Sequence, residues 1–208
     1  MKYLGEYYSN CRQHKGKREV ILQEPFNPIM LNTILNKKTK KKEPRVVYTP
    51  YAFNYGMIPQ TWENSDIIDP ETKLYGDNDP LDICELGKKT MQVGNVCRVR
   101  ILGSFCVSDQ GEMDWKILAI NSEEAESRRI QNLKAYQELL PGFIEEMMEW
   151  FRVYKTYEGK RENTIMFGGK IFELDHTLKL IQSSHKEYKK LMSSNKWKHK
   201  DYWCSSNQ

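Results

Sequence analysis

The stretch VCRVRILGSFCVSDQGEMDWKILAI, residues 96–120, decides the fold class. Over residues 96–101 apolar residues alternate with arginines, which predicts a strand with one buried and one exposed face. Two further apolar runs, at residues 104–107 and 115–120, are separated by a polar turn and predict two more strands. We therefore expect an antiparallel meander in this part of the chain.

The last third of the chain has the periodicity of helices. Apolar residues recur every three or four positions over residues 143–154, just after Pro141-Gly142, and again over residues 174–192. Upstream of the meander, short strands are expected at residues 18–22 and 45–48. The sequence thus predicts an α+β fold, mainly β, with two C-terminal helices packed on the strands.

The segment 51–86 differs from its surroundings in composition. It is dense in Gly, Pro, Asn and Asp and has no helical or strand periodicity. We expect an irregular loop here, and loops held by a rigid scaffold are where functional residues concentrate.

Bulk composition indicates a globular chain. Among 208 residues, 39% are hydrophobic and 29% charged, and the five cysteines include no C-x-x-C pair, which favours a reducing compartment. The first twenty residues contain no continuous apolar run, so neither a signal peptide nor a membrane anchor is expected. We expect one domain over residues 1–192 and a polar, disordered tail over residues 193–208.

The net charge of +4 is unevenly distributed, with lysine-rich runs at residues 37–42 and 186–200. Such runs are usually solvated surface, and the run at 37–42 is expected to form a hairpin loop. The alternative for that run is nuclear targeting or nucleic-acid contact, a reading that short basic runs often match by accident.

Three carboxylates, Asp77, Asp79 and Asp82, fall within six positions around a proline. A cluster of this kind persists most readily when cations neutralise it, and oxygen ligands favour Mg²⁺, Ca²⁺ or Mn²⁺ over Zn²⁺. A solvated acidic turn is the plainer alternative. A calcium-binding EF-hand is excluded, because Leu81 and Lys88 occupy ligand positions and Asp82 stands where the motif requires glycine.

Two more acids, Asp109 and Asp114, flank the turn of the meander, which should bring them close together, and Lys116 follows them. A cation among metal-binding acids suggests a phosphate ligand, which further cations and phenols could hold by charge-assisted hydrogen bonds. The candidates at the ends of predicted elements are Tyr51, Tyr55, Tyr154, Lys155 and Lys160.

Four segments together resemble the soluble family I inorganic pyrophosphatases, most closely the eukaryotic branch. They are YGMIPQTWE (residues 55–63), GDNDPLDICE (76–85), DWK (114–116) and EWFRVYK (149–155). The resemblance extends over about residues 17–192. It implies a five-stranded, OB-like, twisted β-barrel, flanked by the two helices, with the active site at the barrel mouth.

The resemblance also implies an activity and its participants. The reaction would be hydrolysis of diphosphate to two phosphates by Mg²⁺-activated water, with several Mg²⁺ ions and with Mn²⁺ able to substitute. It implies an inorganic diphosphatase that forms a homodimer. From the cysteine usage and the absence of an apolar leader we expect the cytoplasm, with the nucleus as the alternative, and neither a membrane nor a nucleic acid as partner.

Individual roles follow position by position from the resemblance. Asp79 would be the general base, and Tyr51 would assist the leaving group. The metal ligands would be Asp77, Asp82, Asp109, Asp114 and, through metal-bound water, Glu19. The residues holding substrate would be Lys17, Arg45, Tyr55, Lys116, Tyr154 and Lys155, with Lys40 the other candidate for the position given to Arg45.

The N-terminal segment 1–16 departs from the family pattern. Ser9 stands where the family carries an acid, and the tryptophan of that segment is missing. An alternative from a different class is therefore a catalytically weak, pyrophosphatase-like protein with a binding or chromatin-associated role.

Overall fold

The computed structural model describes residues 51–194 in full. Before that it describes residues 36 and 39–43 with their side chains, and the backbone alone of residues 4–10, 18–20, 29–31, 33–35 and 44. The predicted strand at 45–48, the divergent segment 1–16 apart from its backbone at 4–10, and the tail from residue 195 lie outside these residues.

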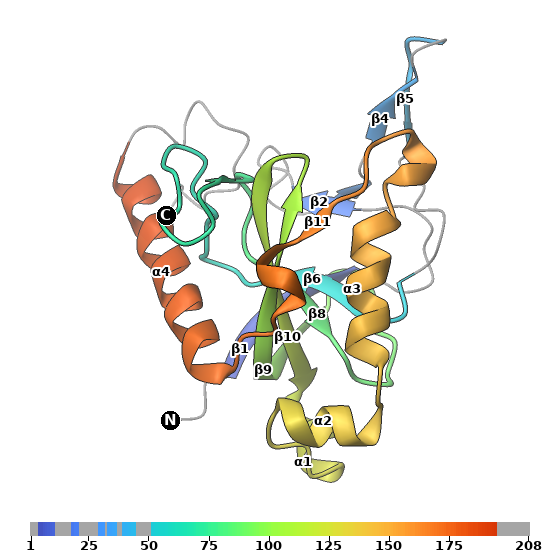
Figure 1. Cartoon of the computed structure of the whole chain (residues 1–208), viewed down its shortest axis with the longest axis vertical. Coiled ribbons are helices and arrows are strands. Elements are labelled where there is room, and N and C mark those ends of the chain that lie inside the picture. Colours follow the sequence, from blue (N-terminus) through green and yellow to red (C-terminus); the bar gives the residue numbers. More distant parts are fainter. Residues whose placement is uncertain are drawn as a thin grey trace.

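The described chain is mainly strand, with helices concentrated in its C-terminal half (Figure 1). The strands of the main sheet are β1 (Leu4–Asn10), β6 (Asn54–Met57), β7 (Tyr75–Gly76), β8 (Asp82–Glu85), β9 (Val96–Asp109), β10 (Glu112–Asn121) and β11 (Thr164–Ile165). Two separate hairpins are β2 (Arg18–Val20) with β3 (Ile29–Leu31), and β4 (Thr33–Leu35) with β5 (Lys42–Pro44). The prediction of an α+β fold dominated by strands is confirmed.

Strand pairing in the main sheet runs β11, β9, β1, β6, β8, β10, β7, and β9 also pairs with β10. The β9–β10 hairpin is antiparallel, whereas β8 and β7 run parallel to β10. The finer expectation of a five-stranded closed barrel stays a prediction.

One detail of the predicted meander was wrong. The strands expected at 96–101 and 104–107 are one strand, β9, which continues through Gly103. The pairing with β10 shifts register between Leu118 and Ala119, which lie opposite Gly103 and Ile101. The extra residue is absorbed by a bulge, which bends a strand without ending it.

The expectation of an irregular loop over residues 51–86 was wrong in part, because three short strands interrupt a segment that is otherwise mostly turns and irregular chain. The segment contains the short strands β6, β7 and β8, which are held by pairing with distant strands and not by their own periodicity. All of β8 after Asp82 is buried, as is most of β6. Strands buried on both faces lack the alternation that identifies a strand in sequence.

Two helices cover opposite sides of the sheet (Figure 1), and both were predicted. They are α3 (Phe143–Val153) and α4 (Leu174–Ser193). One core cluster joins α3 to residues such as Phe105 and Leu118, and a second joins α4 to their strand neighbours, such as Cys106 and Ile117. Because successive strand residues face opposite sides, β9 and β10 form the wall between two cores.

The remaining described elements are short. They are α1 (Ser122–Ser127), α2 (Leu133–Leu139) and the 3₁₀ turns η1 (Thr156–Glu158) and η2 (Met166–Gly169). None of the helices in the described part of the chain has the length and apolar character needed to span a lipid bilayer.

The described part of the lysine-rich run, Lys40 to Lys42, lies in the hairpin of β4 and β5, as expected, and this hairpin projects from the body of the protein (Figure 1). The side chain of Asn36 organises the turn: it accepts from the Thr39 amide at 3.1 Å and donates to Glu43 at 2.8 Å. Lys40, Lys41 and Lys42 are exposed.

Candidate active site

A buried lysine joins the acidic loop to the meander. Lys116 is 1% exposed; its ammonium donates to the Tyr55 hydroxyl at 2.9 Å and forms ion pairs with Asp82, at 2.5 Å, and with Asp114. Tyr55 in turn donates to Asp82. The strands bring these groups together, because Lys116 lies opposite Asp82 in the β8–β10 ladder and Asp114 lies two residues before Lys116, on the same face of β10.

The loop that carries Asp77 and Asp79 is shaped by its own backbone. The Asp79 amide donates to an Asp77 carboxylate oxygen at 2.9 Å, and the intervening Asn78 has a left-handed backbone with φ of 77°. The amide oxygen of Asn78 accepts from the Trp62 indole at 3.3 Å and from Ser65 at 2.9 Å. Asparagine tolerates this conformation better than most residues, so the sequence suits the turn.

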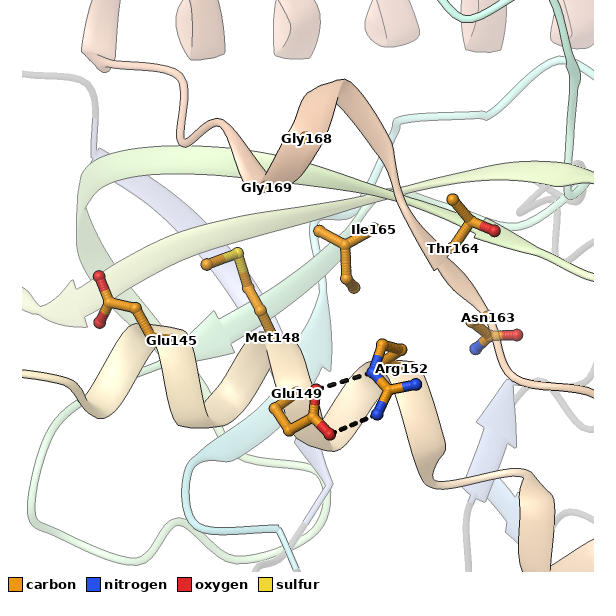
Figure 2. Close-up of a pocket in the computed structure, with 9 residues that line it drawn as sticks. All are labelled: Glu145, Met148, Glu149, Arg152, Asn163, Thr164, Ile165, Gly168 and Gly169. Carbon is orange, nitrogen blue, oxygen red and sulfur yellow. Dashed lines mark hydrogen bonds and ion pairs between the residues drawn. The ribbon is translucent and has the colours of Figure 1, made fainter.

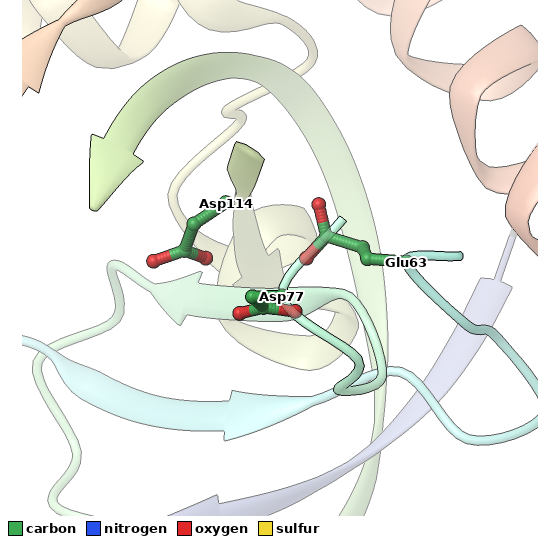
Figure 3. Close-up of side chains that lie close together, drawn as sticks. All are labelled: Glu63, Asp77 and Asp114. Atoms are coloured by element: carbon green, nitrogen blue, oxygen red, sulfur yellow. The ribbon is translucent and has the colours of Figure 1, made fainter. Parts of the chain in front are cut away.

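A third carboxylate, which the sequence analysis did not assign, joins two of the predicted ligands. Oxygens of Glu63, Asp77 and Asp114 all lie within 4.8 Å of one another (Figure 3). Glu63 falls within the segment 55–63 that carried the family resemblance, but its position in that segment gave no sign that it would be buried beside Asp77. Its proximity arises from packing between segments and not from local sequence.

Burial raises the proton affinity of all three acids in this cluster. Two effects raise the pKa of Glu63 well above its usual range: the larger is burial away from water, and the smaller is repulsion from Asp77 and Asp114. Burial and then the charge of Asp114 do the same to the pKa of Asp77. Burial raises the pKa of Asp114 to about 7, although the Lys116 ammonium acts in the opposite direction. Crowded acids of this kind can lower their free energy by binding a proton or a cation.

Lys116 keeps its charge in this site. Burial disfavours the ammonium, but attraction to Asp114 and Asp82 is stronger in sum and raises the pKa of Lys116 well above its ordinary value. One buried positive charge therefore faces several carboxylates.

The shifted pKa of Asp114 predicts a pH-dependent stability in the presence of EDTA. The folded state holds the Asp114 proton up to about pH 7, whereas the group's ordinary pKa is 3.8. Since the folded state binds the proton more tightly, stability from this group is lost as pH rises between those values. Relative to Asp114→Asn, the thermal midpoint of the natural chain should fall by roughly 10 °C between pH 4.5 and 7.5. Parallel midpoint curves for the two proteins would contradict this assignment.

A second anchored acid lies where the β9–β10 turn meets the end of α3. Asp109 forms an ion pair with Lys155 and accepts from the Tyr154 hydroxyl at 3.3 Å. Burial would raise the pKa of Asp109, but the charge and hydrogen bond of Lys155 outweigh it, so the pKa lies below its usual value. Asp109 is not in the Glu63 cluster, although its charge acts on the pKa of Asp114.

Three of the predicted phenols form one wall of aromatic rings. Tyr51 stacks on Tyr55 with ring centroids 5.1 Å apart, and Trp150 lies between Tyr51 and Tyr154, at 4.8 and 4.7 Å. Burial raises the pKa of Tyr55 and of Tyr154, with repulsion from Asp82 and Asp109 adding to the respective shifts. Both phenols therefore keep their protons and can donate hydrogen bonds.

A separate hollow of about 490 Å³ lies between α3 and residues 163–169 (Figure 2). Arg152 at its edge forms ion pairs with Glu149 and Glu162. None of the predicted site residues lines this hollow.

The structure thus gathers most of the predicted site residues and leaves three without a described side chain. Contacts join Asp82, Asp114, Lys116 and Tyr55 in one group; an oxygen of Asp77 lies within 4.8 Å of one of Asp114, and the backbone amide of Asp79 donates to Asp77. A second group is Asp109, Tyr154 and Lys155, and Tyr51 lies in the aromatic wall. Lys17 and Arg45 lie outside the described residues, and Glu19 is described only as backbone in β2. Lys40, the other candidate for the arginine position, is exposed at the hairpin turn.

Comparison with known protein families identifies the family to which the chain belongs. The model of the inorganic pyrophosphatase family matches residues 13–189. The chain belongs to the inorganic pyrophosphatase family. Its resemblance to that family, inferred from four short segments, is thereby confirmed.

Individual relatives agree with this assignment. The chain is 37% identical over 188 residues to inorganic pyrophosphatase 2, mitochondrial, of Mus musculus, covering 87% of this chain and 54% of that protein. It is similar to the recombinant inorganic pyrophosphatase from T brucei brucei, with a TM-score of 0.84 and 30% identity over 94% of this chain and 56% of the other. A truncated vacuolar soluble pyrophosphatase of Trypanosoma cruzi, in complex with PPi, gives a TM-score of 0.83 and 32% identity over 93% and 72%.

The chain is shorter than these pyrophosphatases. It spans between 54% and 63% of the length of the first curated relatives that it matches. One of those relatives is named mitochondrial and another carries no compartment in its name, so the family leaves the compartment of this chain open.

Proposed function

We propose that this chain hydrolyses inorganic diphosphate to two phosphates with Mg²⁺. The observation that carries the proposal is the convergence of acids from two separate segments: Asp82 and Asp114 pair with one buried lysine, and oxygens of Asp77 and Asp114 lie within 4.8 Å of each other. Family membership supports it, and the T. cruzi relative was determined with PPi. The alternative of a binding protein without turnover is not favoured, because the model of the inorganic pyrophosphatase family matches residues 13–189 of the chain.

The donor atoms suit the proposed ion. They are carboxylate oxygens, which hard cations such as Mg²⁺ prefer, and no thiolate or imidazole lies among them in the described part of the site. Asp77, Asp82 and Asp114 would hold the first ions, and Asp109 and Glu19 would help to hold others. When bound, Mg²⁺ neutralises the polyanionic substrate and makes a bound water acidic enough to attack at neutral pH.

The protein's own residues supply the remaining chemistry. Asp79 takes the proton from the attacking water. Lys116, Lys155 and the two protonated phenols Tyr55 and Tyr154 donate hydrogen bonds to phosphate oxygens, where charge-assisted contacts are stronger than neutral ones.

Three further predicted residues are proposed to contact the substrate. Tyr51 assists the departing phosphate, and Lys17 and Arg45 hold phosphate oxygens, with Lys40 the other candidate for the arginine. We further propose that residues 1–192 act as one domain with a five-stranded barrel, that two copies form a dimer, and that Mn²⁺ substitutes for Mg²⁺.

The proposal is tested by measuring phosphate release from diphosphate by the purified full chain. We expect turnover with millimolar Mg²⁺ and none above a no-enzyme blank with EDTA. A rate at the blank level in the presence of Mg²⁺ would refute the proposed function.

A further inference from the structure

Glu63 has a position that the proposed mechanism does not use. It follows Trp62 in the connection between β6 and β7, and it is 1% exposed. One carboxylate oxygen accepts a hydrogen bond from the backbone amide of Trp115 at 3.0 Å. Trp115 stands between Asp114 and Lys116 in the sequence. The other oxygen is buried and has no hydrogen-bond partner among the described residues. Such an oxygen is expensive to bury, so its position calls for a partner.

The unpartnered oxygen belongs to a side chain that faces two other acids. Figure 3 shows the carboxylates of Glu63, Asp77 and Asp114 arranged around a common space, with oxygens of all three within 4.8 Å. The nearby cation is Lys116, and its ammonium is engaged by Asp82, Asp114 and Tyr55. The ion pairs of the described residues include none for Glu63.

The backbone of Glu63 fixes this arrangement. Its amide donates to the carbonyl of Asp79 at 2.9 Å, and its carbonyl accepts from the amide of Asn78 at 3.1 Å. Gly76 lies so close that an added Cβ would stand 2.4 Å from the Glu63 carbonyl carbon. Glu63 is thus held against the acidic loop by its main chain and against β10 by its side chain, which makes the cluster preorganised.

We propose that Glu63 is a further carboxylate ligand of the divalent-cation centre to which Asp77 and Asp114 belong. This inference rests on the proposed function and deepens it by adding a ligand that the family resemblance did not assign. Three oxygens from three segments match the preference of Mg²⁺ for oxygen ligands, with water completing the shell. The cation would be the positively charged partner of the buried Glu63 oxygen that has no hydrogen bond from the described residues.

The first test compares Mg²⁺ binding by the natural chain and by Glu63→Gln, using calorimetry without substrate. Glutamine keeps an oxygen for the Trp115 amide and nearly the same shape, but it removes the charge. We expect the Kd for Mg²⁺ to rise tenfold or more and the rise in thermal midpoint caused by Mg²⁺ to shrink, while the midpoint in EDTA is retained or increased.

A matched control is Glu85→Gln. Glu85 is also 1% exposed, but its carboxylate oxygens accept from the Asn54 side chain and from the amides of Gly87 and Asn121. This variant should lose stability while keeping the natural affinity for Mg²⁺. An equal loss of affinity in both variants, or an unchanged Kd in Glu63→Gln, would overturn the proposal.

A second measurement does not depend on a variant that folds. In crystals of the natural chain soaked in Mn²⁺, the anomalous peak nearest Asp77 and Asp114 should lie within about 2.4 Å of a Glu63 oxygen, near the range of hard-cation bonds. A peak bound by the two aspartates with Glu63 beyond hydrogen-bond reach would overturn the proposal. Failure of the natural chain to bind Mg²⁺ or to release phosphate would instead refute the proposed function itself.

Discussion

Asp79→Asn should lower kcat for diphosphate hydrolysis by a factor of about 10² to 10⁴, the range that a positioned general base contributes. The loss follows from chemistry and not from folding. The Asp79 side chain is exposed, and its backbone makes two hydrogen bonds that do not involve the carboxylate: the amide donates to Asp77 and the carbonyl accepts from the Glu63 amide, both at 2.9 Å. Asparagine preserves these bonds but cannot take a proton from water.

The measurement is phosphate release at saturating diphosphate and Mg²⁺, with thermal midpoints measured in parallel. Asp66→Asn is a suitable control, because Asp66 is an exposed aspartate in the same connection between β6 and β7 and is not a predicted site residue. We expect the control to retain the natural kcat and both variants to retain the natural midpoint. If Asp79→Asn keeps kcat within about threefold, a range too small for loss of a general base, another group must accept the proton.

The sequence predicted well those parts of the fold whose burial is one-sided. The helices α3 and α4 each have one apolar stripe, so the helical repeat of apolar residues could be recognised in the sequence. In the first half of β9, Val99 and Ile101 alternate with exposed or half-exposed arginines, which is the repeat of a strand. The strands β6 and β8 gave no such signal. Most of their residues are buried: β6 lies between β1 and β8, and β8 lies between β6 and β10 and contributes to both core clusters. Their turn-forming composition suggested a loop.

The site residues show the same difference: those grouped by sequence could be predicted, and one that is brought in by packing could not. The acids Asp77, Asp79 and Asp82 are neighbours in sequence, and Asp114 and Lys116 lie two apart where the predicted turn meets a predicted strand, so their grouping could be anticipated. Glu63 could not be placed in this way. Its burial beside Asp77 depends on the close passage of Gly76 over its backbone and on a hydrogen bond to Trp115, 52 residues away.

Lys116→Met should produce the largest loss of stability. Methionine is unbranched and apolar and can keep the packing of the lysine stem against Phe151, whose ring centroid lies 5.2 Å from the ammonium. It removes the positive charge from between Asp82 and Asp114, whose side chains are only 21% and 6% exposed. Removing one partner of a buried ion pair typically costs about 3 to 5 kcal/mol. For a chain of this size the thermal midpoint should fall by about 6 to 20 °C in EDTA.

Two comparisons show whether uncompensated charge is the cause. In the double variant Lys116→Met with Asp114→Asn, one of the stranded carboxylates is gone, so its midpoint in EDTA should lie above that of Lys116→Met alone. Saturating Mg²⁺ should also recover part of the loss in the single variant, because a divalent cation can replace the missing charge beside Asp114. A Lys116→Met midpoint within about 2 °C of the natural chain in EDTA, equivalent to less than about 1 kcal/mol, would mean that the carboxylates are protonated or hydrated. The ammonium of Lys116 would then not be what holds the two segments of the site together.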